Sequence, residues 1–104
     1  MKRGEIWWAE LPPPMGSRPV VLLSRDEAYH SRQLVTVGVV TTTVWKIPAE
    51  VPLGPEDGLA KPCVANLDTI LTVRKSQLTR CISLLRPEKI ERINAAVKFA
   101  LALP

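Results

Sequence analysis

Apolar residues along this chain fall in short runs separated by segments that contain proline or glycine, a pattern typical of small β proteins. Ten prolines punctuate the 104 residues. Alternating or β-branched runs predict strands at 5–11, 19–24, 34–42, 63–73 and 81–85. The run 46–53 also alternates, but its prolines confine it to a sheet edge or force a bulge.

The last part of the chain changes to a helical period. Pro87 suits the first helical position, and Glu88 places an acid where the helix dipole favours one. Apolar residues then recur at helical spacing, with charged residues off that stripe. The stripe consists of Ile90, Ile93, Val97 and Leu101, and the charged set of Lys89, Glu91, Arg92 and Lys98. We therefore predict a single domain over residues 1–104, a small, strongly bent sheet or barrel covered by one amphipathic helix.

Composition narrows the class of protein without identifying a function. With 46% hydrophobic and 23% charged residues, the chain has the composition of an ordinary globular domain. No apolar run approaches the roughly 18 residues of a membrane helix, and the start lacks the apolar core of a signal peptide. We therefore expect a cytoplasmic protein with no membrane partner. The net charge of +4 is compatible with either a nucleic-acid partner or an acidic protein partner.

The cysteines and the histidine do not suggest a disulfide framework or a metal site. Cys63 and Cys81 are too few for a disulfide scaffold, and we expect two reduced, buried thiols. His30 lies in a polar stretch, where a solvated loop histidine is expected. Because these three residues lack the spacing of metal ligands, we predict no metal and no cofactor.

Arg18 and a run of three threonines are the first candidates for chemistry. Arg18 stands directly before Pro19, which holds it in extended geometry at the entrance to an apolar strand. Its guanidinium is a permanently charged, fork-shaped donor suited to phosphate, although a surface arginine beside a strand is the simpler alternative. Thr41, Thr42 and Thr43 follow another apolar strand. Their hydroxyls could hold phosphate oxygens, but threonine is also simply a good strand residue.

Asp68 and the tryptophans form a second group of candidates. Asp68 interrupts an apolar strand, so it either forms a surface salt bridge or lies near an arginine that it orients or exchanges a proton with. Asn66 lies two residues earlier on the same strand. Trp7 and Trp8 face opposite sides of their strand, which assigns one to the core and the other to an edge or a dimer interface. Trp45 follows the threonines on a loop, where it could stack on a base or meet a partner protein.

Four motifs in the same order and with similar spacing resemble those of the MazF/PemK-type toxins of bacterial toxin–antitoxin systems. Each motif alone is weak, but together they cover nearly the whole chain. The motifs are the opening 2–7, the Arg-Pro-Val strand at 16–21, the strand end at 39–42 with Pro48 beyond it, and the stretch 68–73 followed by Lys75 and Leu78.

The resemblance implies an SH3-like, strongly bent antiparallel barrel of mainly β class with a C-terminal helix, working as a homodimer. It also implies a metal-independent endoribonuclease (an mRNA interferase) that leaves 2′,3′-cyclic phosphate and 5′-hydroxyl ends on single-stranded RNA and that a cognate antitoxin blocks. By this resemblance Arg18 and Thr41 are catalytic, and Asp68 is a possible acid–base or orienting residue. The expected RNA-binding residues are Ser17, Thr42, Thr43, Trp45 and Asn66.

The chain departs from the family pattern around Asp68. Thr69 stands where many members have glutamine, Leu71 where they have arginine, and Asn66 where some have a basic residue. The loop 12–17 is also shorter and richer in proline than is usual. These departures leave the cleavage motif open. They also keep two alternatives: a non-enzymatic toxin on the same fold, such as a gyrase inhibitor, and a nucleic-acid-binding barrel without activity.

Overall fold

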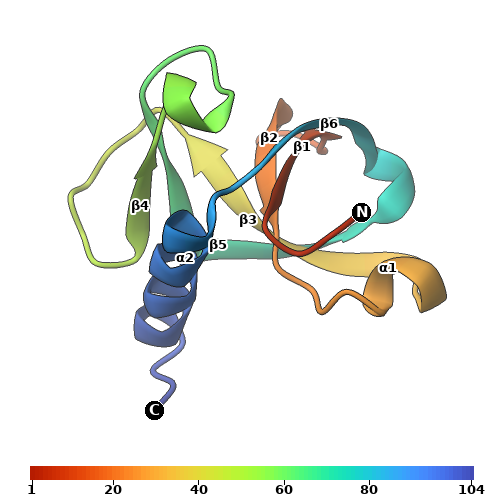
Figure 1. The fold of residues 1–104 in the computed structure, drawn as a ribbon. Coiled ribbons are helices and arrows are strands. Elements are labelled where there is room, and N and C mark those ends of the chain that lie inside the picture. Colours follow the sequence, from red (N-terminus) through yellow and green to blue (C-terminus); the bar gives the residue numbers. More distant parts are fainter.

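The computed structural model describes all 104 residues as six strands, two α-helices and two single-turn 3₁₀ helices (Figure 1). The strands are β1 (Glu5–Glu10), β2 (Ser17–Leu22), β3 (Leu34–Thr41), β4 (Glu50–Leu53), β5 (Cys63–Arg74) and β6 (Leu78–Leu84). The helical elements are α1 (Ala28–Ser31), η1 (Pro55–Asp57), η2 (Lys75–Gln77) and α2 (Pro87–Ala100). The predicted strands and terminal helix are thus confirmed, with β6 beginning at Leu78 instead of at position 81.

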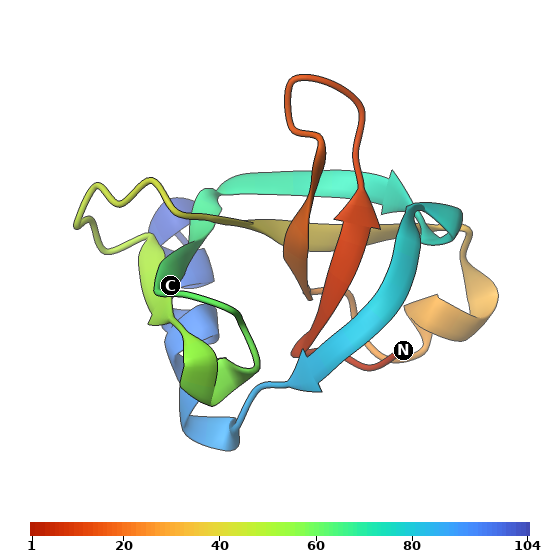
Figure 2. The ribbon, with the colours of Figure 1, turned by 90° about the horizontal axis from the view of Figure 1, so that it is seen from above.

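All six strands pair antiparallel in the order β4-β5-β3-β2-β1-β6. The sheet curls strongly, so that β6 and the β1–β2 hairpin stand across the long β3–β5 pair (Figure 2). Strands β4 and β6 are the two ends of this order and do not pair with each other. The architecture is therefore a curled half-barrel with a C-terminal helix, which confirms the predicted mainly β, strongly bent fold. Neither α-helix has the length and apolar character of a membrane-spanning helix.

A bulge in β5 bends the sheet. Val39 of β3 pairs with Asn66, whereas the neighbouring Gly38 pairs with Ile70, so the residues 67–69 have no partner on β3. Leu67 fills the space above Gly38, where a Cβ would lie 2.8 Å from the Leu67 side chain. Because glycine at position 38 has no side chain, the Leu67 side chain can pack against its backbone and enter the core at the bend.

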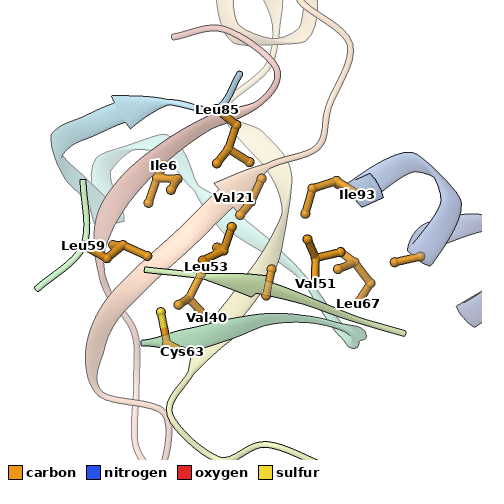
Figure 3. Packing of buried hydrophobic residues seen from close by; sticks show 12 residues of the cluster. Ile6, Val21, Val40, Val51, Leu53, Leu59, Cys63, Leu67, Leu85 and Ile93 are labelled. Atoms are coloured by element: carbon orange, nitrogen blue, oxygen red, sulfur yellow. The ribbon is translucent and has the colours of Figure 1, made fainter. Parts of the chain in front are cut away.

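Two hydrophobic clusters lie on the two faces of the sheet. Residues from five strands, β1 to β5, and from α2 converge in the first cluster, including Ile6, Leu67 and Ile93 (Figure 3). Val21 of β2 belongs to this cluster, whereas its neighbour Val20 belongs to the second. Strand β2 is therefore buried on both faces, which explains why its sequence is a continuous apolar run without alternation.

Three expectations about single residues were wrong. Leu101, expected in the packed apolar stripe of the helix, is exposed just beyond the end of α2. Cys81 is exposed, because it lies in a run of three exposed residues of β6, whereas Cys63 is buried as expected. Lys89 was assigned to the polar face of the helix, yet it is buried and paired with Asp57. His30 is exposed as expected, although it lies in the short helix α1 and not in a loop.

Candidate active site

A pocket of about 530 Å³ opens where the ends of several strands meet the segment after β4. Strand β2 supplies Ser17, Arg18 and Pro19, and β3 supplies Val40 and Thr41, with Thr42 just after its end; β1 and β6 supply Trp8, Arg80 and Ile82. The remaining wall consists of Gly58, Leu59, Ala60, Lys61 and Cys63. Val40, Leu59 and Cys63 also belong to the first hydrophobic cluster, so the pocket has an apolar base formed by the core.

Arg18 is held in the pocket by its strand and by one hydrogen bond. It pairs with Ala9 of β1, and Pro19 after it restricts its backbone to the extended region. The Arg18 Nε donates to the carbonyl oxygen of Met15 at 2.8 Å. The two terminal NH₂ groups have no partner in the protein, so the forked end of the guanidinium is available to an anion.

Thr41 ends β3 and is half-buried in the same pocket. Its Oγ1 accepts a hydrogen bond from the backbone N–H of Thr43 at 3.2 Å, which leaves the hydroxyl proton free to be donated. Thr42 also lines the pocket, whereas Thr43 does not. The three threonines thus have different positions: two line the cavity, and the third holds Thr41 through its backbone.

Trp8 and Ser17 are both held by the carboxylate of Glu10. The Trp8 Nε1 donates to Glu10 at 3.1 Å, and the Ser17 hydroxyl donates to the other carboxylate oxygen. Glu10 faces Ser17 across the β1–β2 pair but does not itself line the pocket. The indole ring therefore forms a fixed wall, with an apolar face suited to base stacking.

Lys61 and Arg80 are pocket cations that the sequence did not single out. Together with Arg18 they give the pocket three positive charges, and no Asp, Glu or His side chain lines it. Neither Lys61 nor Arg80 takes part in an ion pair. A concave surface with one sign of charge concentrates the field, so this pocket favours an anionic ligand such as a phosphodiester.

Four of the predicted site residues lie outside the pocket lining: Asp68, Asn66, Thr43 and Trp45. Asp68 is exposed in the β5 bulge, and its backbone N–H donates to the Asn66 side chain at 2.9 Å. The Trp45 side chain is 68% exposed on the loop before β4, where its backbone N–H donates to Glu50. The structure therefore brings together Ser17, Arg18, Thr41 and Thr42 in one pocket, and the roles of all eight residues stay predictions.

The Cys63 thiol lines the pocket in its neutral form. Burial raises its pKa above the ordinary value of 9.0, and the nearby carboxylates of Asp57 and Glu56 raise it further. A neutral thiol is a weak nucleophile, so Cys63 serves as an apolar lining residue. No group of three or more His, Cys, Asp or Glu side chains is arranged to hold a metal ion.

Comparison with known proteins gives matches along the whole chain. Residues 2–101 match the family described as PemK-like, MazF-like toxin of type II toxin–antitoxin system. Probable endoribonuclease MazF5 of Mycobacterium tuberculosis is 34% identical over 100 residues, which are 95% of this chain and 91% of that protein. Endoribonuclease EndoA of Bacillus subtilis is 29% identical over 111 residues, covering 99% of this chain and 96% of the relative.

Two solved structures share the fold at moderate sequence identity. Mycobacterium tuberculosis toxin MazF-mt6 superposes with a TM-score of 0.89 at 31% identity, covering 96% of this chain and 98% of that one. An endoribonuclease from Mycobacterial species, solved in complex with its cognate antitoxin, gives a TM-score of 0.89 at 31% identity and covers 100% of this chain and 97% of its own.

Proposed function

Because the chain belongs to the family of PemK-like, MazF-like toxins of type II toxin–antitoxin systems, we propose that it is an endoribonuclease that cleaves single-stranded RNA. The observation that carries this proposal is the placement of Arg18 and Thr41 in one cationic pocket. Arg18 there has free terminal NH₂ groups, and Thr41 has a free hydroxyl proton. These groups can donate to phosphate oxygens, because neither the terminal NH₂ groups of Arg18 nor the hydroxyl proton of Thr41 has an acceptor in the protein.

In the proposed reaction, the 2′-hydroxyl of one nucleotide attacks the adjacent phosphorus. The new 2′-O–P bond forms as the P–O5′ bond breaks, which leaves a 2′,3′-cyclic phosphate and, after protonation of the leaving oxygen, a 5′-hydroxyl. No metal takes part. Negative charge builds up on the two non-bridging oxygens, where Arg18 binds in a bidentate manner and Thr41 donates one further hydrogen bond.

The proton carriers in this proposal are assigned less directly than the phosphate donors. The pocket lining contains no carboxylate and no imidazole, and arginine stays protonated in proteins. By the family pattern Asp68 is the acid–base or orienting candidate, but its exposed side chain lies outside the lining, so no proton passes through it in this proposal. Water therefore accepts the proton that the 2′-hydroxyl loses and supplies the proton that the leaving 5′-oxygen gains.

Around this centre, we propose that the remaining lining binds the RNA chain. Ser17 and Thr42 would contact the backbone near the scissile phosphate, Lys61 and Arg80 would bind flanking phosphates, and Trp8 would stack on a base. Thr43, Trp45 and Asn66 would contact nucleotides farther along the strand. An antitoxin with an acidic segment would compete for the same three cations, as fits the antitoxin complex of a relative.

We further propose a cytoplasmic homodimer.

The test is to incubate the purified protein with single-stranded RNA in a chelating buffer and to map the ends of the products. We expect cyclic-phosphate and 5′-hydroxyl ends at a short, recurring sequence. Arg18→Ala should lose the activity, and Arg25→Ala is the matched control, because Arg25 is exposed and outside the pocket. Absence of cleavage together with inhibition of gyrase would instead support a non-enzymatic toxin. Salt-dependent RNA binding without products would support a binding barrel.

A further inference from the structure

The pocket wall that carries Lys61 has no strand pairing. It belongs to the segment 54–62, which runs between β4 and β5 (Figure 2, green) and contacts the first turn of α2 through Asp57 and Lys89. Hydrogen bonds within the segment close one 3₁₀ turn, with the Gly54 N–H donating to the Asp57 carboxylate at 3.0 Å. Every side-chain hydrogen bond from another element to this segment ends on Asp57, and the Lys89 Nζ also lies 3.8 Å from the exposed Glu56 carboxylate.

Two elements hold Asp57 from outside the segment. The Ser83 hydroxyl of β6 donates to the Asp57 carbonyl oxygen at 2.5 Å, and the Lys89 Nζ of α2 lies 3.3 Å from the Asp57 carboxylate. Lys89 also donates to the Pro52 carbonyl at 2.6 Å, so one ammonium joins β4, the segment and the helix. Gly58 follows with a φ of 87°, and a Cβ there would lie 3.0 Å from Ser83, so glycine is required for this close turn.

Attaching a helix through the Lys89–Asp57 pair carries a large desolvation penalty. The Asp57 side chain is 1% exposed and that of Lys89 is 10%, so both charges have lost most of their water. Apolar residues of similar volume commonly stabilise a fold as well as such a pair does, whereas the pair specifies one geometry. The apolar contacts of Ile93 and Ala96 already attach α2 to the core. The charged pair thus adds a defined position for the 54–62 segment.

We propose that Lys89 is a positioning residue for RNA binding, acting through Asp57 to fix the wall that carries Lys61. This inference rests on the proposed function, because RNA phosphate is the ligand that Lys61 would meet. Arg18 and Thr41 stand on strands that do not depend on the pair. Loss of the pair therefore weakens RNA binding without altering the chemical step, which predicts a higher KM at unchanged kcat.

The test uses the double variant Lys89→Met/Asp57→Asn. It leaves no unpaired buried charge, and the asparagine oxygen still accepts from the Gly54 N–H. Lys98→Met is the matched control, because it removes the same charge from an exposed position on the same helix. Ser83→Ala is a second, milder variant that releases the Asp57 carbonyl without changing any charge. Circular dichroism and thermal melting confirm that each variant is folded.

We expect the double variant to raise KM for a model RNA about tenfold, the effect of losing one charged hydrogen bond, while kcat stays at the parental value. Ser83→Ala should raise KM less, and Lys98→Met should not change it. Amide hydrogen exchange at 58–61 should be faster in the double variant and in Ser83→Ala, but not in Lys98→Met. An unchanged KM in folded double variant and Ser83→Ala protein overturns the proposal. If the parental protein cleaves no RNA, the proposed function is refuted. The hydrogen-exchange measurement needs no RNA, so it still shows whether Asp57 holds the wall that carries Lys61.

Discussion

Arg18 and Thr41 stand on paired strands, whereas Lys61, on another wall of the same pocket, stands on a segment with no strand pairing. Backbone hydrogen bonds to two neighbouring strands determine where β2 and β3 place their side chains. The 54–62 segment is held instead by Leu59 in the first hydrophobic cluster and by hydrogen bonds to Asp57. This difference matches the proposed functions of the two walls. Donors to the transition state, such as Arg18 and Thr41, need a fixed geometry, whereas a cation that binds a flanking phosphate, such as Lys61, tolerates some movement.

The largest effect is expected where the segment loses its counter-charge. Lys89→Met leaves the Asp57 carboxylate buried and unpaired, which should lower the free energy of unfolding by about 3–5 kcal/mol. Urea denaturation followed by tryptophan fluorescence measures this loss. The exposed Lys98→Met should change stability by less than about 0.5 kcal/mol. Equal stabilities of the two variants would show that the buried pair does not hold the segment.

The next effect concerns the strand side of the pocket. Arg18→Ala should lower kcat about a hundredfold or more, equivalent to about 3 kcal/mol, because one preorganised donor to the transition state is lost. Its stability should stay close to that of the parental protein, since the guanidinium makes one hydrogen bond, to Met15. Single-turnover cleavage of a model RNA measures the rate. Cleavage at the parental rate would exclude Arg18 from the proposed mechanism.

Replacement of Lys61 should give a smaller effect of a different kind. Lys61→Ala should weaken RNA binding about tenfold, by about 1.4 kcal/mol, and leave kcat unchanged, because this cation binds a flanking phosphate in our proposal. The slope of log affinity against log salt should also become shallower by about 0.7, the value for one phosphate contact on a single strand. Fluorescence anisotropy at several salt concentrations tests this. A lower kcat would instead place Lys61 at the scissile phosphate.

The smallest effect is expected at Asp68. Because its side chain is exposed and does not line the pocket, Asp68→Asn should change kcat by less than about twofold, within the range of ordinary surface substitutions. A pH–rate profile of the variant beside the parental protein provides the measurement. Loss of one limb of the profile, with a large drop in kcat, would identify Asp68 as the proton carrier despite its position.

The sequence predicted the strand side of the pocket better than the other walls, for a physical reason. Arg18 and Thr41 sit at strand ends marked by a proline and by a β-branched run, which are local signals. Arg80 reaches the pocket because β6 pairs with β1, where it lies opposite Trp8. Such a register across about seventy residues leaves no local pattern. The net charge was the one sequence signal of further cations, and it does not indicate where in the fold these cations lie.

Lys89 shows the same limit in the helix. Helical periodicity found the apolar stripe correctly at Ile93, but it treats every charged residue as solvated. Lys89 lies one turn before Ile93 and is buried because Asp57, 32 positions earlier, supplies its counter-charge. Only the folded sheet brings these two residues together. The exposed Cys81 and the site roles of Trp8 and Lys61 depend on tertiary placement in the same way.

The burial of β2 on both faces has a consequence for how the molecule opens. Val20 packs in one hydrophobic cluster and Val21 in the other, so neither cluster can come apart while this strand stays in place. Local fluctuations that release β2 must therefore disrupt both clusters, which makes the strand part of the most cooperative unit of the protein. Arg18 stands at the start of that strand. Its geometry should persist until global unfolding, whereas the 54–62 segment, which has no strand pairing, should open at a lower free energy.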